Sequence, residues 1–549
     1  MEKIANNILS LMHEEGLRLI QKRFQVFSSL VAQAKYLTEC GKYEAGAVYA
    51  EIAAFYATYQ HCGLFVSPDL EQVLLAIGQK AIQTNFTPIK NTSLSGTPSN
   101  VLHVITGAPC IGGHSKMLCR WIQQDRERSH SLVVTRQTLV DVAPFLKEAV
   151  FKSQGKIYAL KESIGSVISW ATKLREIATS ADVVVLHTHQ EDVIPTIAFA
   201  NKDQSPPVIY VNQADQCFWQ GIGISDVIAN LRESGMQLSL ERRNIAAERN
   251  LLLPIVLNPA HRTLSRVEAK RQLDIPDNSV LLLSIARAHK YKTIDGISFA
   301  DVHLPLMQKY NHAILIVIGS DNSEDWSSAI QQTEGRIKVF AERADTSVFY
   351  QAADIYVDTF PIISNTSLLE AGSYGVPVVS RYPFSDTCRI IGADAPGLDG
   401  KLLRARNLEE YIKILSSLID DEELRLSLGE ATKRQIEEIH IGSNWQLWLE
   451  NLYLRAVSLP RVTMTSAVPQ GMFLGETDGL LSGIFCKKDI DIDVIIQSRM
   501  RMMPLEQRWQ NWIKLIKMQD LSHFGSFKLF TLLLPEWFYL RMKKLLSYR

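Results

Sequence analysis

Residues 350–379 read Tyr350-Gln-Ala-Ala-Asp-Ile-Tyr-Val-Asp-Thr-Phe-Pro-Ile-Ile-Ser-Asn-Thr-Ser-Leu-Leu-Glu-Ala-Gly-Ser-Tyr-Gly-Val-Pro-Val-Val379. Ile355 to Asp358 has the apolar pattern of a short buried strand, and Val376 to Ser380 has the pattern of a second one. Between them, Ser364 to Ser367 provide hydroxyl and amide groups where a helix begins. Free backbone N–H groups at a helix start attract a diphosphate. The segment therefore predicts a nucleotide-phosphate pocket, with Glu370 one turn further along to hold ribose hydroxyls.

Strand-like runs alternate with helical stretches on both sides of this segment. In the first half we expect strands at Val101–Thr106, Ser131–Thr135, Val183–Leu186 and Val208–Val211, and in the second half further strands at Val280–Ile285, Ala313–Ile318 and Ile337–Phe340. This alternation indicates βαβ units and parallel sheets, so the fold class is α/β with two Rossmann-like halves facing a cleft. Helices near 408–419, 422–439 and 445–457 are expected to close the second half.

Composition limits the classes of protein to which this chain can belong. The 549 residues are too many for one core, and 58 basic side chains balance 58 acidic ones, which removes the simplest case for nucleic-acid binding. The seven cysteines are scattered without C-x-x-C spacing, so neither a disulfide framework nor a zinc site is indicated, and a reducing cytosol fits best. The first residues lack a signal-peptide pattern, and the apolar run 527–540 is interrupted by charge and proline. We expect a cytoplasmic protein, either soluble or peripheral to a membrane.

The chain is divided into four parts by its patterns. Helical spacing predicts a helical N-terminal region at 1–90, and the Ser, Thr, Gly and Pro content of Asn91–Asn100 marks a linker. The two Rossmann-like domains are placed at 91–255 and 256–458. A partly helical C-terminal extension follows at 459–549. Its last stretch, 524–549, combines aromatic and basic residues, which fits contact with an anionic membrane surface or, equally, a helix that covers core surface.

The loop after the first expected strand carries candidate chemistry. Gly112-Gly113-His114-Ser115-Lys116 allows tight turning and close approach of the backbone to a ligand, and it lacks the Gly-Lys-Ser/Thr ending of a Walker A loop. His114 could take a proton from an attacking hydroxyl, although it could equally cap the following helix or bind a phosphate.

Two later strand ends offer polar groups to the same cleft. His187 and His189 follow the expected strand Val183–Leu186, and of the two we choose His189 for contact with the substrate. With no third ligand nearby in sequence, no metal site is expected. Asn212, Gln213 and Asp215 follow the next strand, where Asp215 could orient an acceptor hydroxyl or serve as an N-cap.

The motifs together resemble GT-B glycosyltransferases, over about residues 100 to 455. Asp358–Pro361, Asn365–Ser367, Glu370 and Gly375–Val379 are similar to the donor loop of O-linked N-acetylglucosamine transferases. Retaining GT-B enzymes often carry E-x7-E, of which Glu370 matches the second Glu while Ile362 occupies the first position, so stereochemistry stays open. The resemblance makes Gly112 and Gly113 an acceptor-side loop and puts His114 where inverting members place a base.

The resemblance also implies donor-binding residues in the second half. Ser284 to Lys292 looks like the donor-phosphate segment of the family, with Arg287 and either Lys290 or Lys292 facing the diphosphate. Cations there would stabilise the charge that builds on the leaving diphosphate. The alternative is a solvated basic loop. The donor set is completed by Asn365, Thr366, Ser367 and Glu370.

The expected function is therefore transfer of a sugar from a nucleotide-diphosphate sugar, expected to be UDP-linked, to a hydroxyl acceptor in polysaccharide or glycoconjugate synthesis. The enzyme would be metal-independent and hexosyltransferase-like, with no cofactor besides the sugar nucleotide as co-substrate. Its acceptor would be a carbohydrate, a lipid-linked molecule or a protein, and no nucleic acid is expected. Two alternatives are a sugar-nucleotide epimerase and a degenerate transferase that acts as a binding scaffold through residues 1–85.

Overall fold

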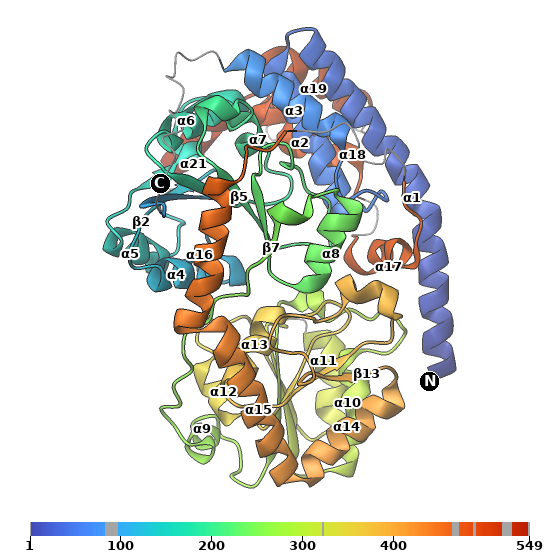
Figure 1. Cartoon of the computed structure of the whole chain (residues 1–549). Coiled ribbons are helices and arrows are strands. Elements are labelled where there is room, and N and C mark those ends of the chain that lie inside the picture. Colours follow the sequence, from blue (N-terminus) through green and yellow to red (C-terminus); the bar gives the residue numbers. More distant parts are fainter. Residues whose placement is uncertain are drawn as a thin grey trace.

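Two parallel sheets form the body of the protein (Figure 1). The computed structural model describes residues 2–82, 97–320, 323–463, 472–486, 490–518 and 530–546. The first sheet has seven strands in the order β3-β2-β1-β4-β5-β6-β7, and the second has six in the order β10-β9-β8-β11-β12-β13. The predicted α/β class and GT-B arrangement, with a helical N-terminal region, are confirmed.

The first sheet is built from apolar runs buried on both faces, as parallel strands require. Its strands are β1 Asn100–Ile105, β2 Ser129–Val134, β3 Ile157–Ala159, β4 Val183–His187, β5 Val208–Asn212, β6 Val227–Asn230 and β7 Asn250–Leu252. The helices around it are α4 Gly113–Gln124, α5 Pro144–Lys152, α6 Val167–Ala178, α7 Ile194–Ala198 and α8 Glu233–Arg242. The four strands expected in this half are all present, and β3, β6 and β7 are additional.

The second sheet contains the five strands that the sequence predicts and one more, β13. Its strands are β8 Val280–Ile285, β9 Ala313–Ile318, β10 Ile337–Phe340, β11 Ile355–Val357, β12 Val378–Arg381 and β13 Leu403–Ala405. The helices of this half are α9 Arg266–Gln272, α10 Phe299–Lys309, α11 Ser323–Gln332, α12 Ser347–Ala352, α13 Asn365–Ser373, α14 Leu408–Asp420 and α15 Glu422–His440. Short 3-10 turns occur at η1 Leu160–Glu162, η2 Lys202–Gln204, η3 Ala247–Arg249, η4 Ala288–Lys290, η5 Asp386–Ile391 and η6 Met500–Met502.

One helix departs from the expected placement. We expected the helix near 445–457 to close the second half, but α16 (Gly442–Ser458) returns to the first sheet, where it contacts β4 and β6 (Figure 1). Its buried Trp445 packs edge-on against Trp121 of α4, with ring centroids 5.9 Å apart. Tyr453 accepts a 3.0 Å hydrogen bond from Trp121 Nε1. These aromatic contacts stabilise the crossing, by which α16 joins the two halves.

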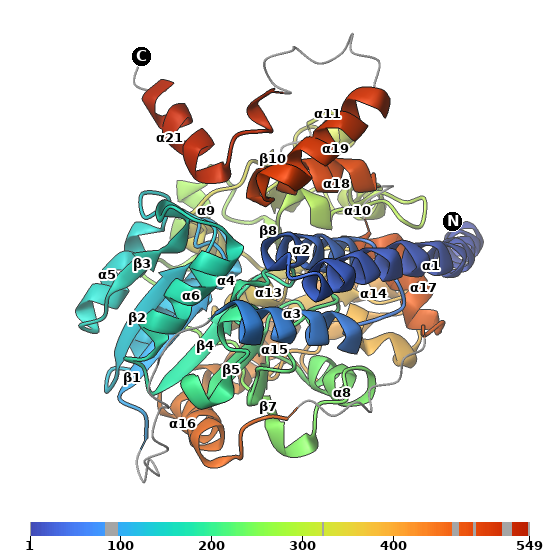
Figure 2. The same cartoon turned by 90° about the horizontal axis from the view of Figure 1, so that it is seen from above.

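The terminal regions pack on one another. The N-terminal helices are α1 Glu2–Glu39, α2 Tyr43–Tyr59 and α3 Pro68–Ala81, and the C-terminal ones are α17 Glu476–Phe485, α18 Ile492–Arg499, α19 Leu505–Met518 and α21 Glu536–Leu546. Helix α1 contacts α2 and α17, and α18 contacts α2, so both ends of the chain meet beside the first sheet (Figure 2). Residues 91–96 of the expected linker, and 524–529 and 547–549 of the C-terminal stretch, lie outside the described residues.

No helix among the described residues has an apolar stretch long enough to cross a bilayer.

Candidate active site

A cavity of about 1380 Å³ lies between the two halves. Loops that follow β1, β4 and β5 form its wall in the first half, and the loop after β8 and the start of α13 form its wall in the second. This position matches the carboxyl ends of parallel strands, where open α/β sheets bind ligands. The wall includes these residues named from the sequence: Gly112, Gly113, His114, His189, Gln213, Asp215, Arg287, Lys290, Lys292, Asn365, Thr366, Ser367 and Glu370. Asn212 does not line the cavity, because it is buried and hydrogen-bonded to Asn230 and Ser239.

The loop before α13 is held by a buried carboxylate. Asp358 Oδ1 accepts from the backbone N–H groups of Thr359 at 2.8 Å and Ser364 at 3.0 Å, and burial raises the pKa of Asp358 to about 6. The hydroxyl of the N-cap residue Ser364 donates to Ser367 Oγ at 3.2 Å, but it accepts no hydrogen bond from the backbone N–H groups of the first turn of α13. The N–H groups of that turn are therefore available for an anion at the cavity wall.

The cationic residues of the second half differ in what they contact. Arg287 is half exposed, and its Nη2 donates to Ile111 O across the cavity at 2.9 Å. Lys290 Nζ donates to Ile363 O at 2.8 Å, directly before α13, and burial lowers the pKa of Lys290 to about 8. Lys292 Nζ donates to Ile484 O of α17 at 2.5 Å. Lys290 thus lies next to the start of α13, Arg287 reaches the loop of the first half, and Lys292 ties the second half to the C-terminal extension.

Glu370 is paired with a residue of the first half. Its Oε1 accepts from Arg120 Nη2 at 2.5 Å, and its Oε2 accepts from Tyr350 Oη at 3.1 Å. The ion pair is only 16% exposed on each side. Sequence reasoning missed Arg120 because it is one of several basic residues on an amphipathic helix, and no local pattern shows that it faces a carboxylate 250 residues away.

The glycine pair brings the two halves close together. Gly112 has φ +145°, which residues with a side chain rarely adopt, and a Cβ at that position would lie 3.4 Å from Arg287 Nη2. A Cβ at Gly113 would lie 3.3 Å from Thr366 Oγ1. The close approach expected of this loop is therefore made, in this structure, to the donor loop of the second half.

Two histidines of the first half, His114 and His189, line the cavity. His114 is reached by solvent at the start of α4, and desolvation by the cavity walls, with His189, Arg287 and Lys290 as cationic neighbours, lowers its pKa below the ordinary 6.5. His189 lies beside Glu191, with 3.8 Å between Nδ1 and Oε1, and this contact raises the pKa of His189. At neutral pH His114 is therefore an uncharged imidazole that can accept a proton.

Asp215 is engaged in a buried ion pair. Both of its carboxylate oxygens accept from Arg232, at 2.6 and 2.7 Å, and Arg232 also contacts Asp394 and the carbonyls of Ile390 and Gly392 in the second half. Asp215 is 3% exposed. Because its carboxylate is occupied by this contact between the halves, we assign Asp215 no role in binding an acceptor.

Five cavity-lining residues have a buried polar atom without a hydrogen-bond partner among the described residues. One of these atoms, Arg499 Nε, lies 3.0 Å from Glu51 Oε1 in an ion pair. The other four are Ser115 Oγ, Glu191 Oε2, Gln213 Oε1 and Asn365 Oδ1. Buried polar atoms in proteins are nearly always hydrogen-bonded, and exceptions call for a missing partner. A polar ligand with several hydroxyl groups would provide partners on both sides of the cavity.

Helices from both terminal regions cover the cavity, which the sequence did not predict. Glu51 of α2 is 2% exposed and pairs with Arg499 at the end of α18, with 3.0 Å between Oε1 and Nε. Arg136, after β2, pairs with the other carboxylate oxygen. Glu536 of α21 lies 3.4 Å from Lys161. All five residues line the cavity, so segments from both ends of the chain enclose it.

Comparisons with known proteins agree with this architecture. Residues 265–435 match the family model described as glycosyl transferases group 1. The chain is 26% identical over 210 residues to the D-inositol 3-phosphate glycosyltransferase of Corynebacterium aurimucosum, which covers 35% of this chain and 47% of that protein. It is 25% identical over 227 residues to the N,N'-diacetylbacillosaminyl-diphospho-undecaprenol alpha-1,3-N-acetylgalactosaminyltransferase of Campylobacter jejuni, covering 40% and 53%. The chain thus spans about half the length of the curated relatives it matches.

A solved structure shows the same fold. The glycosyltransferase from Rickettsia africae superposes with a TM-score of 0.50 at 13% identity, covering 66% of this chain and 99% of that one. At this identity the likeness concerns the fold alone.

Proposed function

Since residues 265–435 belong to the glycosyl transferases group 1 family and the chain has the GT-B fold, we propose that the protein transfers a sugar from a nucleotide-diphosphate sugar to a hydroxyl acceptor. The observation that carries the proposal is the cavity between the halves. It combines an uncapped helix start with Arg287 and Lys290 on one wall, and it presents polar atoms that lack partners on both walls. UDP is the proposed nucleotide, on the similarity of the donor loop.

The proposed mechanism assigns each wall one task. The start of α13, Arg287 and Lys290 hold the diphosphate and stabilise the charge that develops as the sugar leaves, so that no divalent metal is needed. Glu370 holds the ribose hydroxyls after exchanging its contact with Arg120. His114, uncharged at neutral pH, takes the proton of the attacking acceptor hydroxyl.

For the acceptor we propose a lipid-linked molecule at a cytoplasmic membrane surface. One relative is named for a diphospho-undecaprenol acceptor. Helix α19 exposes Leu505, Trp509 and Ile513 at a spacing of four residues, which places them on one face. Helix α21 exposes Phe538 and Leu545, and exposed basic residues accompany both groups: Lys514, Lys517, Arg541 and Lys543. An apolar face beside basic side chains suits an anionic bilayer.

A ligand panel tests the donor proposal. In a thermal-shift panel of UDP-, GDP-, ADP- and TDP-sugars, one nucleotide sugar should raise the melting temperature most, because a ligand that binds only the folded state raises its stability by mass action. Incubation of the protein with that nucleotide sugar and an acceptor should then release free nucleotide together with a glycosylated product. A nucleotide sugar that is converted to its epimer, without a glycosylated product, would contradict the transferase proposal.

The membrane proposal has its own test. Vesicles that contain phosphatidylglycerol should sediment the protein, and the double variant Trp509→Glu, Ile513→Glu should remain in the supernatant. Sedimentation of the variant to the same extent as the unaltered protein would refute this face as the contact surface.

A further inference from the structure

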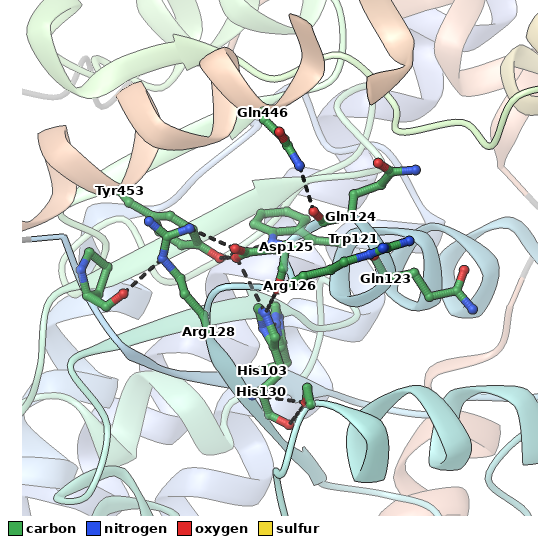
Figure 3. Close-up of polar contacts among 12 residues, drawn as sticks. His103, Trp121, Gln123, Gln124, Asp125, Arg126, Arg128, His130, Gln446 and Tyr453 are labelled. Carbon is green, nitrogen blue, oxygen red and sulfur yellow. Dashed lines mark hydrogen bonds and ion pairs between the residues drawn. The ribbon is translucent and has the colours of Figure 1, made fainter. Parts of the chain in front are cut away.

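Three buried histidines form a hydrogen-bonded chain across the first sheet. His103 on β1 lies between His130 on β2 and His187 on β4, and each side chain is at most 1% exposed. The distance from His103 Nε2 to His130 Nδ1 is 3.0 Å, and that from His103 Nδ1 to His187 Nε2 is also 3.0 Å. Figure 3 shows His103 and His130 next to Asp125 and Tyr453. The proposed chemistry uses none of these rings.

One end of the chain is anchored at a backbone carbonyl. His130 Nε2 lies 2.9 Å from Asp125 O. The Asp125 side chain is itself held by Arg128 Nη1 at 2.7 Å and by the hydroxyl of Tyr453 at 3.0 Å, as Figure 3 shows. A carbonyl oxygen only accepts hydrogen bonds, so His130 Nε2 must carry the hydrogen.

This anchor fixes the tautomers of the whole chain. In a neutral imidazole one nitrogen donates and the other accepts, so Nδ1 of His130 accepts from Nε2 of His103. In turn, Nδ1 of His103 accepts from Nε2 of His187. Burial lowers the pKa of all three rings, which keeps them neutral. The other end of the chain is therefore an acceptor, His187 Nδ1.

That acceptor sets the orientation of Gln213. Its Nε2 lies 3.3 Å from His187 Nδ1. Because His187 Nδ1 can only accept, Gln213 has to turn its NH2 group toward the ring, and its Oε1 is directed elsewhere. Gln213 lines the cavity, and this Oε1 is one of the buried atoms without a partner among the described residues.

We propose that Gln213 Oε1 accepts a hydrogen bond from a hydroxyl of the transferred sugar, and that the chain His187–His103–His130 is the positioning device that keeps the amide in this orientation. This inference rests on the proposed function. The sugar is attached to the diphosphate, so it has to extend from Arg287 and Lys290 toward the wall of the first half, to which Gln213 belongs. A glutamine free to turn over would present a donor as readily as an acceptor. The fixed orientation selects a group that donates.

Binding measurements test the role of Gln213. Calorimetry compares the preferred nucleotide sugar with its bare nucleoside diphosphate, in the unaltered protein, in Gln213→Leu and in Gln216→Leu. Gln216 is a matched amide on the same loop and the same cavity wall. We expect Gln213→Leu to lose about tenfold in affinity for the nucleotide sugar, the worth of one hydrogen bond, with unchanged affinity for the bare nucleotide. Gln216→Leu should change neither affinity.

The outcomes separate this inference from the function it rests on. If Gln213→Leu binds the sugar nucleotide as the unaltered protein does, or loses the bare nucleotide equally, the contact with the sugar is refuted. If the unaltered protein binds no nucleotide sugar, the proposed function fails, and the inference with it. Nitrogen-15 spectra of the imidazoles give a readout that does not need a ligand: all three rings should be Nε2–H tautomers, and an Nδ1–H tautomer at His187 would overturn the orientation argument.

Discussion

The buried histidine chain makes stability depend on pH, and His187 allows the size of the effect to be worked out. Burial, and next the neighbouring His114, lower the pKa of His187 from 6.5 to about 3. Among the residues that the structure describes, the other groups recorded in contact with this ring are His103, the amide of Gln213 and Trp121, none of them a carboxylate that would oppose the shift. As the pH falls below 6.5, the unfolded chain takes up a proton at this residue and the folded chain does not. The stabilising contribution is therefore complete above pH 6.5 and is lost between pH 6.5 and 3.

The expected loss is large enough to measure. Between pH 7.5 and 5.5, linkage at this one site lowers the free energy of unfolding by about 1.4 kcal/mol. In the variant His187→Gln the site no longer titrates, so the drop between the two pH values should be smaller by that amount. His261→Gln, at an exposed position, should keep the full drop. Urea denaturation of the three proteins at both pH values gives six free energies, and the double difference between each variant and the unaltered protein cancels contributions that the two share.

Two results would refute the reasoning. An equal pH response in the unaltered protein and in His187→Gln would mean that the ring is protonated as easily in the folded chain as in the unfolded one. A smaller response in His261→Gln would show that exposed histidines cause the effect.

Three further predictions concern the cavity and its supports. Arg287→Ala should reduce transfer by about 10²-fold or more with an unchanged melting temperature, and near-normal turnover would contradict its role at the diphosphate. Arg232→Met leaves Asp215 without its buried partner and should destabilise the protein by about 3–5 kcal/mol, measured by denaturation; an unchanged midpoint would show that water replaces the arginine. Glu51→Gln should release Arg499 and speed limited proteolysis of the C-terminal extension. An unchanged digestion pattern would mean that this ion pair does not hold the extension over the cavity.

The strands were predictable where burial alone decides the sequence. Continuous apolar runs such as Ala313–Ile318 are buried on both faces of the sheet, so they can be recognised as strands from the sequence. The additional strands β6 and β7 were missed because they carry polar residues inward. Asn212 Nδ2 donates to Asn230 Oδ1 at 2.9 Å, and Asn230 Nδ2 donates to Asn250 Oδ1 at 2.7 Å. These amide side chains are hydrogen-bonded to one another across three strands, which a search for apolar runs does not detect.

The site was predictable as far as it follows from topology. Loops at the carboxyl ends of strands converge in any open parallel sheet, so His114, His189 and Arg287 could be assigned to one cleft from the sequence. What could not be predicted is pairing between distant segments. The partner of Glu51 on α18 depends on how the two ends of the chain pack, and the apolar face of α16 indicates a helix without indicating which sheet it covers.

The contacts between the two halves set a condition on donor binding. In this structure Arg120 occupies the carboxylate of Glu370 that is proposed to hold ribose, and Arg287 donates to the carbonyl of Ile111 in the first half. Under the proposed function, a nucleotide sugar would compete with both contacts, because each uses a group assigned to the donor. The partly buried ion pair is costly to break while leaving Glu370 unpaired, so ribose hydroxyls would have to replace Arg120 as it leaves. We therefore expect donor entry and separation of the halves to be one coupled step, with Arg120 returning to Glu370 after release of the nucleotide.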